Sequence, residues 1–190
     1  MRALLALNYH SLELVVINDG SRDNTLAELH RAFKLRTARV LYLPTIPSAP
    51  VHEIYTSALD PRLIVIDKDS AGSKADAVNA GLNVATSPYV CVVDADSILE
   101  KDSLLRIMAS VFSDPQRVVA AGGIVRVLNG CQVSKGELRR VKLPRGSLEV
   151  MQVVEYLRAF LIGREAWAHL MRCPLFQEHL ASFRPTWCVR

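Results

Sequence analysis

The sequence predicts an α/β fold in which a largely parallel β-sheet is covered by helices on both faces. Short apolar segments rich in β-branched residues alternate with segments whose apolar residues recur at helical spacing. Polar turn residues, mainly aspartate, glycine and serine, follow most of the apolar segments. The chain has 190 residues, and 50% of them are hydrophobic, which is enough to form one globular core. Buried strands that alternate with helices are typical of parallel sheets.

The first part of the chain is predicted as strand, helix, strand, loop and strand. Residues 12–19 (LELVVIND) are β-rich, and the turn GSRDNT separates them from 26–35 (LAELHRAFKL), where apolar residues have helical spacing. Residues 39–43 (RVLYL) are a second short strand. The prolines of 44–50 (PTIPSAP) require a loop or an extended connection. Residues 62–68 (RLIVIDK) form a third strand.

The second part continues the alternation. Residues 69–85 begin with a Gly/Ser turn and continue as an amphipathic helix, and 88–96 (PYVCVVDAD) form a fourth strand. A helix is predicted over 99–112, and 117–130 is expected to form one more strand or a bent pair. A long helical pattern covers 147–170. We find no internal repeat and no low-complexity segment.

Five carboxylates fall at or just beyond predicted strand ends: Asp19, Asp67, Asp69, Asp94 and Asp96. Because the carboxyl ends of parallel strands share one edge of the sheet, we expect these side chains to gather along that edge. Ligands of open α/β sheets bind at the same edge. The fold prediction therefore places a binding site there.

The segment Asp94-Ala95-Asp96 puts two carboxylates one residue apart directly after an apolar strand. Two neighbouring carboxylates repel, so they need either a cation or full hydration. Mg²⁺ and Mn²⁺ prefer oxygen ligands and often bind one or two carboxylates together with substrate phosphates. Such an ion would neutralise the charge on a departing nucleoside diphosphate. An ordinary turn with Asx hydrogen bonds is the alternative interpretation.

Charge and composition limit the possible partners. The net charge of +4 comes from 23 basic and 19 acidic residues, with a basic excess in 136–146 (GELRRVKLPRG). This segment suits phosphates, an anionic membrane surface or simply solvent. Aromatic residues do not alternate with the basic ones, so we expect no nucleic-acid binding.

The cysteines and the hydropathy pattern indicate a reducing, cytosol-facing compartment. The four cysteines form no CxxC pair, so neither a zinc site nor a disulfide framework is predicted. Cys91, within an apolar strand, is interpreted as a small core residue. The sequence contains no apolar run of membrane-spanning length and no signal-peptide pattern.

Three segments in this order, INDGSRDNT, DKDSAGSKADAVNAGLN and VVDADSILEKDSL, each follow a predicted strand. Together they resemble the family 2 glycosyltransferases, which have the Rossmann-like GT-A fold. The segment PRGSLEVMQVVEYLRAFLIGREAW is similar to the one that follows the core in membrane-bound processive members, the synthases of cellulose, chitin, hyaluronan and poly-N-acetylglucosamine. The resemblance covers roughly Leu4 to His169.

The resemblance implies a role for individual residues. Asp19 is similar to the aspartate that contacts the uridine base or ribose, and Asn18 stands where the family commonly has a second acid. Lys74 resembles the lysine near the nucleotide and its diphosphate, where a cation suits the ligand's charge. Asp94 resembles the residue that contacts the donor ribose or diphosphate, and Asp96 the ligand of Mg²⁺ or Mn²⁺.

The resemblance also implies a domain organisation. Residues 1–147 correspond to a partial GT-A core that lacks the family's first strand, 148–170 to the helix that follows the core, and 171–190 to a divergent tail. The general base of the family is expected beyond this sequence, so no catalytic residue is assigned. In the full enzyme a UDP-sugar would donate its sugar, with inversion, to a glycan or other hydroxyl acceptor at the cytoplasmic face of the cell membrane. This chain would supply the donor-binding half and be inactive alone.

Two other classes stay open. A nucleotidyltransferase also uses metal-binding carboxylates on a similar sheet, but it should have a Gly-rich loop with Arg or Lys after its first strand. A non-catalytic remnant or interaction module would fold without metal-dependent affinity for a nucleotide. Asp76 and Asn79 on the predicted helix either line the same pocket or are helix-surface polar residues.

Overall fold

The computed structural model describes residues 1–38, 42, 44–115, 118, 120–123, 127–134, 137–159 and 181–183. The chain divides into two compact units. One unit is His10–Val90, which we call the four-stranded unit. The other joins Met1–Tyr9 to described residues from Cys91 onward, and we call it the three-stranded unit.

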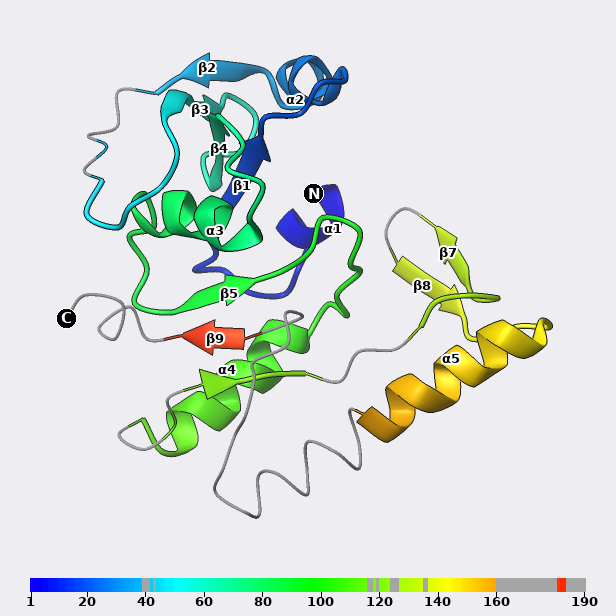
Figure 1. Ribbon diagram of the computed structural model, residues 1–190. Helices are drawn as coiled ribbons and strands as arrows, with labels where there is room; N and C mark the ends of the chain where they lie inside the picture. The colour runs from blue at the N-terminus through cyan, green and yellow to red at the C-terminus, as the bar shows by residue number, and fades with distance from the viewer. Residues whose placement is uncertain are drawn as a thin grey trace. The chain divides into compact units, whose positions relative to one another are not determined.

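The sheet of the four-stranded unit has the strand order β1-β4-β3-β2 (Figure 1). Strand β1 (Leu14–Asp19) pairs in parallel with β4 (Leu63–Lys68). Strand β3 (Val51–Ser57) pairs antiparallel with β4 and with β2 (Leu35–Thr37). The α/β class with a GT-A type of sheet is confirmed, and its parallel centre is the β1–β4 pair. The antiparallel strands β3 and β2 extend this pair on one side.

Strands β2 and β3 differ in position from the strand that the sequence predicts in this region. The strand predicted at 39–43 lies outside the described residues except for Tyr42, which is not in a strand. The loop 44–50 is confirmed, but β3 directly after it was not predicted. Its valine, isoleucine, tyrosine and threonine are typical strand residues, and this composition was the available signal.

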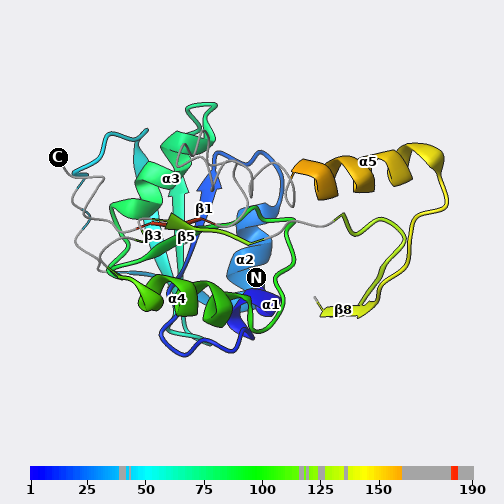
Figure 2. The same ribbon diagram turned by 90° about the horizontal axis from the view of Figure 1, so that it is seen from below.

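Helices α2 (Thr25–Phe33) and α3 (Lys74–Leu82) belong to the same unit. Helix α2 ends at Phe33 because Lys34 adopts a left-handed conformation with φ of 49°. Leu35 therefore starts β2 and does not continue the predicted helix. Helix α3 lies alongside β1 in both views (Figures 1 and 2). A Cβ at Gly81 would come within 3.2 Å of Cδ1 of Ile17, so glycine permits this close packing.

The hydrophobic core of the four-stranded unit lies on the sheet. Ile54, Ile66 and Val84 form a buried cluster against which Val15 and Ile17 pack. Leu63 and Val65 in β4 are also fully buried. Because β4 is buried along its length, the polar residues at its end are held at fixed positions.

The three-stranded unit contains α1 (Arg2–Leu5), β5 (Val90–Val92), α4 (Ser103–Ser113), β6 (Ala120–Ala121) and β9 (Ala181–Phe183). The strand order is β5-β9-β6, and β9 pairs antiparallel with β6. Strand β5 is shorter than the predicted strand, and α4 begins four residues later than the predicted helix. Burial raises the pKa of the β5 thiol, Cys91, to about 11, so it stays protonated at neutral pH.

The same unit continues with a hairpin of β7 (Gln132–Ser134) and β8 (Glu137–Arg140) and with helix α5 (Ser147–Leu157). The hairpin was not predicted. The strand predicted at 117–130 lies partly outside the described residues, and β6 is the strand found there. Helix α5 confirms the start of the helix predicted over 147–170, and most of the remainder lies outside the described residues. Among described helices, none has the length and apolar character needed to cross a bilayer.

Candidate functional site

The parallel pair β1–β4 brings two polar residues of each strand together at its carboxyl end. Asn18 lies opposite Asp67, and Asp19 lies opposite Lys68. Successive side chains of a strand point to opposite faces of the sheet. Asn18 and Asp67 therefore lie on one face, and Asp19 and Lys68 lie on the other. The carboxyl edge therefore carries two different polar groups, one on each face.

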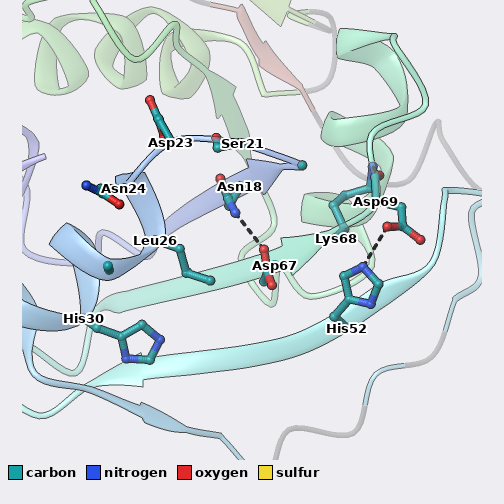
Figure 3. Close-up of a pocket in the computed structure, with 12 residues that line it drawn as sticks. Asn18, Ser21, Asp23, Asn24, Leu26, His30, His52, Asp67, Lys68 and Asp69 are labelled. Atoms are coloured by element: carbon teal, nitrogen blue, oxygen red, sulfur yellow. Dashed lines mark hydrogen bonds and ion pairs between the residues drawn. The ribbon is translucent and has the colours of Figure 1, made fainter.

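The face with Asn18 and Asp67 opens into a cavity of about 520 Å³ between α2 and the sheet (Figure 3). Its lining residues come from the end of β1, the β1–α2 loop, α2 and the adjoining parts of β3 and β4: Asn18, Gly20, Ser21, Asp23, Asn24, Leu26, Ala27, His30, His52, Asp67, Lys68 and Asp69. His52 Nε2 lies 2.8 Å from Asp69 Oδ1 at the cavity's rim. The sequence had not indicated either histidine as part of a site.

Asn18 forms the floor of the cavity. It is 5% exposed, and its Nδ2 donates a hydrogen bond of 2.7 Å to Asp67 Oδ1. Its own Oδ1 is buried, and no described residue donates to it. This geometry explains why an amide suits this position: a second carboxylate would face Asp67 at hydrogen-bond distance, and neither could donate.

An Asn18→Asp variant is therefore expected to lose stability at pH 7, by about 1–3 kcal/mol, because a buried hydrogen bond becomes a repulsive contact. The loss should shrink at pH 5, where a proton shared between the two carboxylates restores a donor. Urea unfolding at both pH values measures it. The matched control is Asn24→Asp, because Asn24 lines the same cavity in an exposed position and aspartate caps a helix equally well. An equal loss in both variants would contradict the explanation.

The charges around the cavity decide what it can hold. Asp23, Asp67 and Asp69 contribute carboxylates, and the ammonium of Lys68, which is also a lining residue, is already paired with Asp19 and Asp76. Carboxylates accept hydrogen bonds and repel phosphates. The cavity therefore suits neutral groups that donate hydrogen bonds, such as hydroxyls or the N–H groups of a base.

On the opposite face, Lys68 forms an ion cluster. Its side chain has 0% exposure, and Nζ donates to Asp19 Oδ1 at 2.8 Å, Asp76 Oδ2 at 2.5 Å and the carbonyl oxygen of Asp69 at 2.5 Å. Ser70 Oγ donates to the other carboxylate oxygen of Asp19 at 3.2 Å. The cluster joins the ends of β1 and β4 to the first turn of α3.

Hydrogen bonding keeps the ion cluster charged. Burial favours a lower pKa for Lys68, but the hydrogen bonds to Asp19 and Asp76 outweigh it and the pKa is raised. The hydrogen bond from Lys68 lowers the pKa of Asp76, with a further contribution from the backbone N–H of Ala49. Lys68 and Asp76 are therefore ionised near neutral pH.

Gly20 shapes the loop that starts the cavity wall. Its φ is +68°, and a Cβ would meet both the nitrogen and the Cβ of Ser70 at 3.0 Å. We expect Gly20→Ala to lower the free energy of unfolding by roughly 1–3 kcal/mol, since left-handed strain adds to a backbone contact. Gly72 has a φ of +69° but open space around it, so Gly72→Ala should lose only the stability that the backbone strain costs. Gly123→Ala should be affected neither by backbone strain nor by a steric contact. Urea unfolding of the three variants checks this order, and equal values would contradict it.

The structure places the sequence-predicted residues Asp19 and Lys74 in the four-stranded unit. Asp19 ends β1 and belongs to the ion cluster. Lys74 is the first residue of α3, is half-buried, and does not line the cavity. The residue that organises Asp19 is Lys68, which the sequence analysis did not single out. A lysine that directly follows an apolar strand opposite an aspartate was the available signal.

Asp76 and Asn79 hold a loop. Asp76 Oδ1 accepts from the backbone N–H of Ala49 at 2.8 Å, and Asn79 Nδ2 donates to the carbonyl oxygen of Pro47 at 2.9 Å. Asn83 binds both backbone groups of Ile46, at 2.9 Å each. These residues lie three and four positions apart, on one side of α3. Neither Asp76 nor Asn79 lines the cavity, so the interpretation as pocket residues does not apply. Both residues fasten the proline-containing loop.

Asp94 and Asp96 belong to the three-stranded unit, just after β5. Asp94 is half-buried and Asp96 is exposed, and a hydrogen bond of 3.0 Å from the Ser97 N–H to the Asp94 carbonyl closes the turn. Within the described part of the chain, no three or more His, Cys, Asp or Glu residues are grouped to hold a metal. A Mg²⁺ or Mn²⁺ ion that takes one or two carboxylates and completes its shell with water and phosphate oxygens needs no such group. The two carboxylates therefore fit an ion shared with a substrate.

Comparisons with known proteins identify the family of this chain. Residues 48–167 match the model of Glycosyl transferase family 2. Poly-beta-1,6-N-acetyl-D-glucosamine synthase of Staphylococcus aureus is 31% identical over 126 residues, which cover 66% of this chain and 24% of that protein. Glycosyltransferase GlyG of Streptococcus pneumoniae serotype 4 is 26% identical over 101 residues, which cover 53% of this chain and 26% of that protein.

The chain thus spans about a quarter of the length of the curated relatives it matches. The family match begins in the loop before β3 and continues through β4, α3, β5 and α4 into α5, so it includes Lys74, Asp94 and Asp96. It extends over more than half of the chain and contains two of the three segments on which the resemblance was based, DKDSAGSKADAVNAGLN and VVDADSILEKDSL. The chain therefore belongs to glycosyltransferase family 2.

Proposed function

We propose that this chain binds the UDP-sugar donor of a glycosyltransferase that transfers a sugar, with inversion, to an acceptor hydroxyl. The observation that carries the proposal is the carboxyl edge of β1 and β4, where a polar cavity and an ordered aspartate lie on the two faces of adjacent strands. Family membership supports the reaction class. The Staphylococcus aureus relative is a synthase of poly-beta-1,6-N-acetyl-D-glucosamine, so UDP-N-acetylglucosamine is the first donor to test.

The charges around the site suggest which residues would bind each part of the donor. The uridine would bind near Asp19 at the carboxyl edge, where carboxylates can accept hydrogen bonds from ribose hydroxyls and the base. The resemblance assigns the diphosphate to Lys74, whose cation suits its charge, and the ribose or diphosphate to Asp94. Asp96 would hold Mg²⁺ or Mn²⁺, and the bound ion would neutralise charge on the departing UDP.

We expect donor binding and no turnover from this chain. Inverting transfer requires a base that deprotonates the acceptor hydroxyl. No residue of this sequence matches the family motif that supplies the base. In the whole protein we propose a glycan acceptor and an attachment to the cytoplasmic face of the membrane, as the resemblance to processive synthases implies.

Calorimetric titration with UDP, with and without Mn²⁺, tests the proposal. We expect UDP to bind much more tightly with Mn²⁺ than without it, and UMP to bind more weakly and with little metal dependence because it lacks the diphosphate that the ion would bridge. CDP is the matched control for the base. A folded chain that binds neither UDP nor UDP-N-acetylglucosamine would favour a non-catalytic interaction module.

A further inference from the structure

Lys68 is buried, charged and close to the proposed donor site, but no role in binding has been assigned to it above. All three of its N–H donors are used: two by carboxylates of Asp19 and Asp76 and one by the Asp69 carbonyl. A lysine with no exposed side-chain surface cannot bind a ligand directly. Any effect on a ligand must therefore act through a residue that it contacts.

We propose that Lys68 is a positioning residue that fixes the carboxylate of Asp19 for the nucleotide, and that Asp76 in turn holds Lys68 in place. The inference rests on the proposed function, because it assumes that Asp19 contacts the uridine part of the donor. It adds two residues, one on β4 and one on α3, that determine donor affinity without touching the donor.

The contacts of Asp19 carry the first step. Oδ1 accepts from Lys68 at 2.8 Å and Oδ2 accepts from Ser70 at 3.2 Å, so neither oxygen is free to rotate. Each carboxylate oxygen has a further lone pair that a ligand hydroxyl or N–H can use. The side chain is 29% exposed, which leaves part of it accessible. Asp19 is thus held in one orientation while it can still accept another hydrogen bond.

The contacts of Asp76 carry the second step. Its Oδ2 accepts from Lys68 at 2.5 Å and its Oδ1 accepts from the Ala49 N–H at 2.8 Å. In Asp76→Asn one of these acceptors becomes an N–H₂ group that faces another donor. The ammonium would lose a partner and move toward Asp19 or toward solvent, and the orientation of Asp19 would change with it.

The role of Asp76 in the loop needs its own control. Asn79 lies one turn further along α3 and holds the same loop through Pro47, and none of the three hydrogen bonds of Lys68 goes to it. Asn79→Ala therefore loosens the loop and leaves the ion cluster intact. A comparison of the two variants separates loop attachment from the positioning of Asp19.

The experiment is a double-mutant cycle on UDP affinity with Mn²⁺, measured by calorimetry on the full chain. We expect Asp76→Asn to weaken UDP binding by roughly tenfold, as the loss of one charge-assisted hydrogen bond would. Asp19→Asn should weaken it at least as much and, because an acceptor oxygen remains, leave binding measurable at high UDP concentration. Asp76→Asn should add little in the Asp19→Asn background, and Asn79→Ala should bind UDP like the wild-type chain.

Three outcomes would overturn the inference. Asp76→Asn could bind UDP with wild-type affinity, or it could weaken UDP binding as much in the Asp19→Asn background as in the wild-type chain. Asn79→Ala could also weaken UDP binding as much as Asp76→Asn does. If the wild-type chain binds no UDP, the proposed function fails. The ammonium signal of Lys68 in proton–nitrogen NMR then tests separately whether Lys68 positions Asp19. A signal that shifts in both Asp19→Asn and Asp76→Asn, but not in Asn79→Ala, supports the positioning of Asp19. A Lys68 signal that does not shift in Asp19→Asn rules out the positioning of Asp19 by Lys68.

Discussion

Replacement of Lys68 by methionine is expected to lower the free energy of unfolding by about 3–5 kcal/mol, the usual range when one partner of a buried ion pair is removed. Methionine fills the volume of the lysine stem, so the loss comes from the charge. Asp19 and Asp76, which now share the ammonium, would face one another without it. A domain of ordinary stability has only about 5–15 kcal/mol in total, so the variant should be close to unfolding at 37 °C.

The pH dependence distinguishes this cause from a packing defect. The pKa of Asp76 is lowered from 3.8, so its contribution is present above 3.8 and is lost as the pH falls through the folded value. The pKa of Lys68 is raised from 10.5, so its contribution is present below 10.5 and is lost as the pH rises through the folded value. The difference between wild type and variant should therefore be largest near neutral pH and should narrow below 3.8 and above 10.5.

Urea unfolding across this pH range measures the difference. Lys142→Met is the matched control, because Lys142 is exposed in the connection between β8 and α5. It should change the free energy of unfolding by at most about 0.5 kcal/mol at any pH. A Lys68→Met loss that does not vary with pH would mean that packing, not the ion cluster, accounts for it.

The parts of the fold that the sequence predicted are those with strong local signals. Strand β1, strand β4 and the helices α2 and α3 combine apolar periodicity with turn residues at their ends, and each was found within a few residues of its predicted position. Strand β3 follows a proline-containing loop and contains histidine, glutamate, threonine and serine among its apolar residues, so its apolar pattern is weak. The antiparallel pairing of β3 with β4 depends on contacts distant in sequence, which local patterns do not contain.

The same distinction applies to the site. The carboxylates Asp19, Asp94 and Asp96 could be identified because they follow strands within recognisable segments. Lys68 and Asn18 could not, because their importance depends on the register between β1 and β4 and on which face of the sheet each one occupies. The roles predicted for Lys74, Asp94 and Asp96 stay predictions, and binding measurements are the test.

The second large effect is expected at Asp94 and Asp96. Replacement of both by alanine should abolish Mn²⁺-dependent UDP binding, with a loss of at least roughly a hundredfold in affinity, because an ion that bridges protein and diphosphate loses its protein ligands. Stability should change little, since Asp96 is exposed and Asp94 only half-buried. Each single variant separates the roles: Asp96→Ala should remove the metal dependence, and Asp94→Ala should weaken UDP both with and without metal.

Calorimetric titrations of UDP at several Mn²⁺ concentrations measure both effects, with unfolding curves to show that each variant is folded. Asp102→Ala is the matched control, because Asp102 is an exposed aspartate near the same turn, whose Oδ1 accepts a hydrogen bond of 2.7 Å from Asn8 Nδ2. Loss of that bond perturbs the unit without removing a proposed ligand. If Asp102→Ala reduces metal-dependent binding as much as the double variant does, the effect is structural. If only the double variant loses it, the two carboxylates act on the ion, because Asp102→Ala also removes a carboxylate near this turn but removes no proposed ligand.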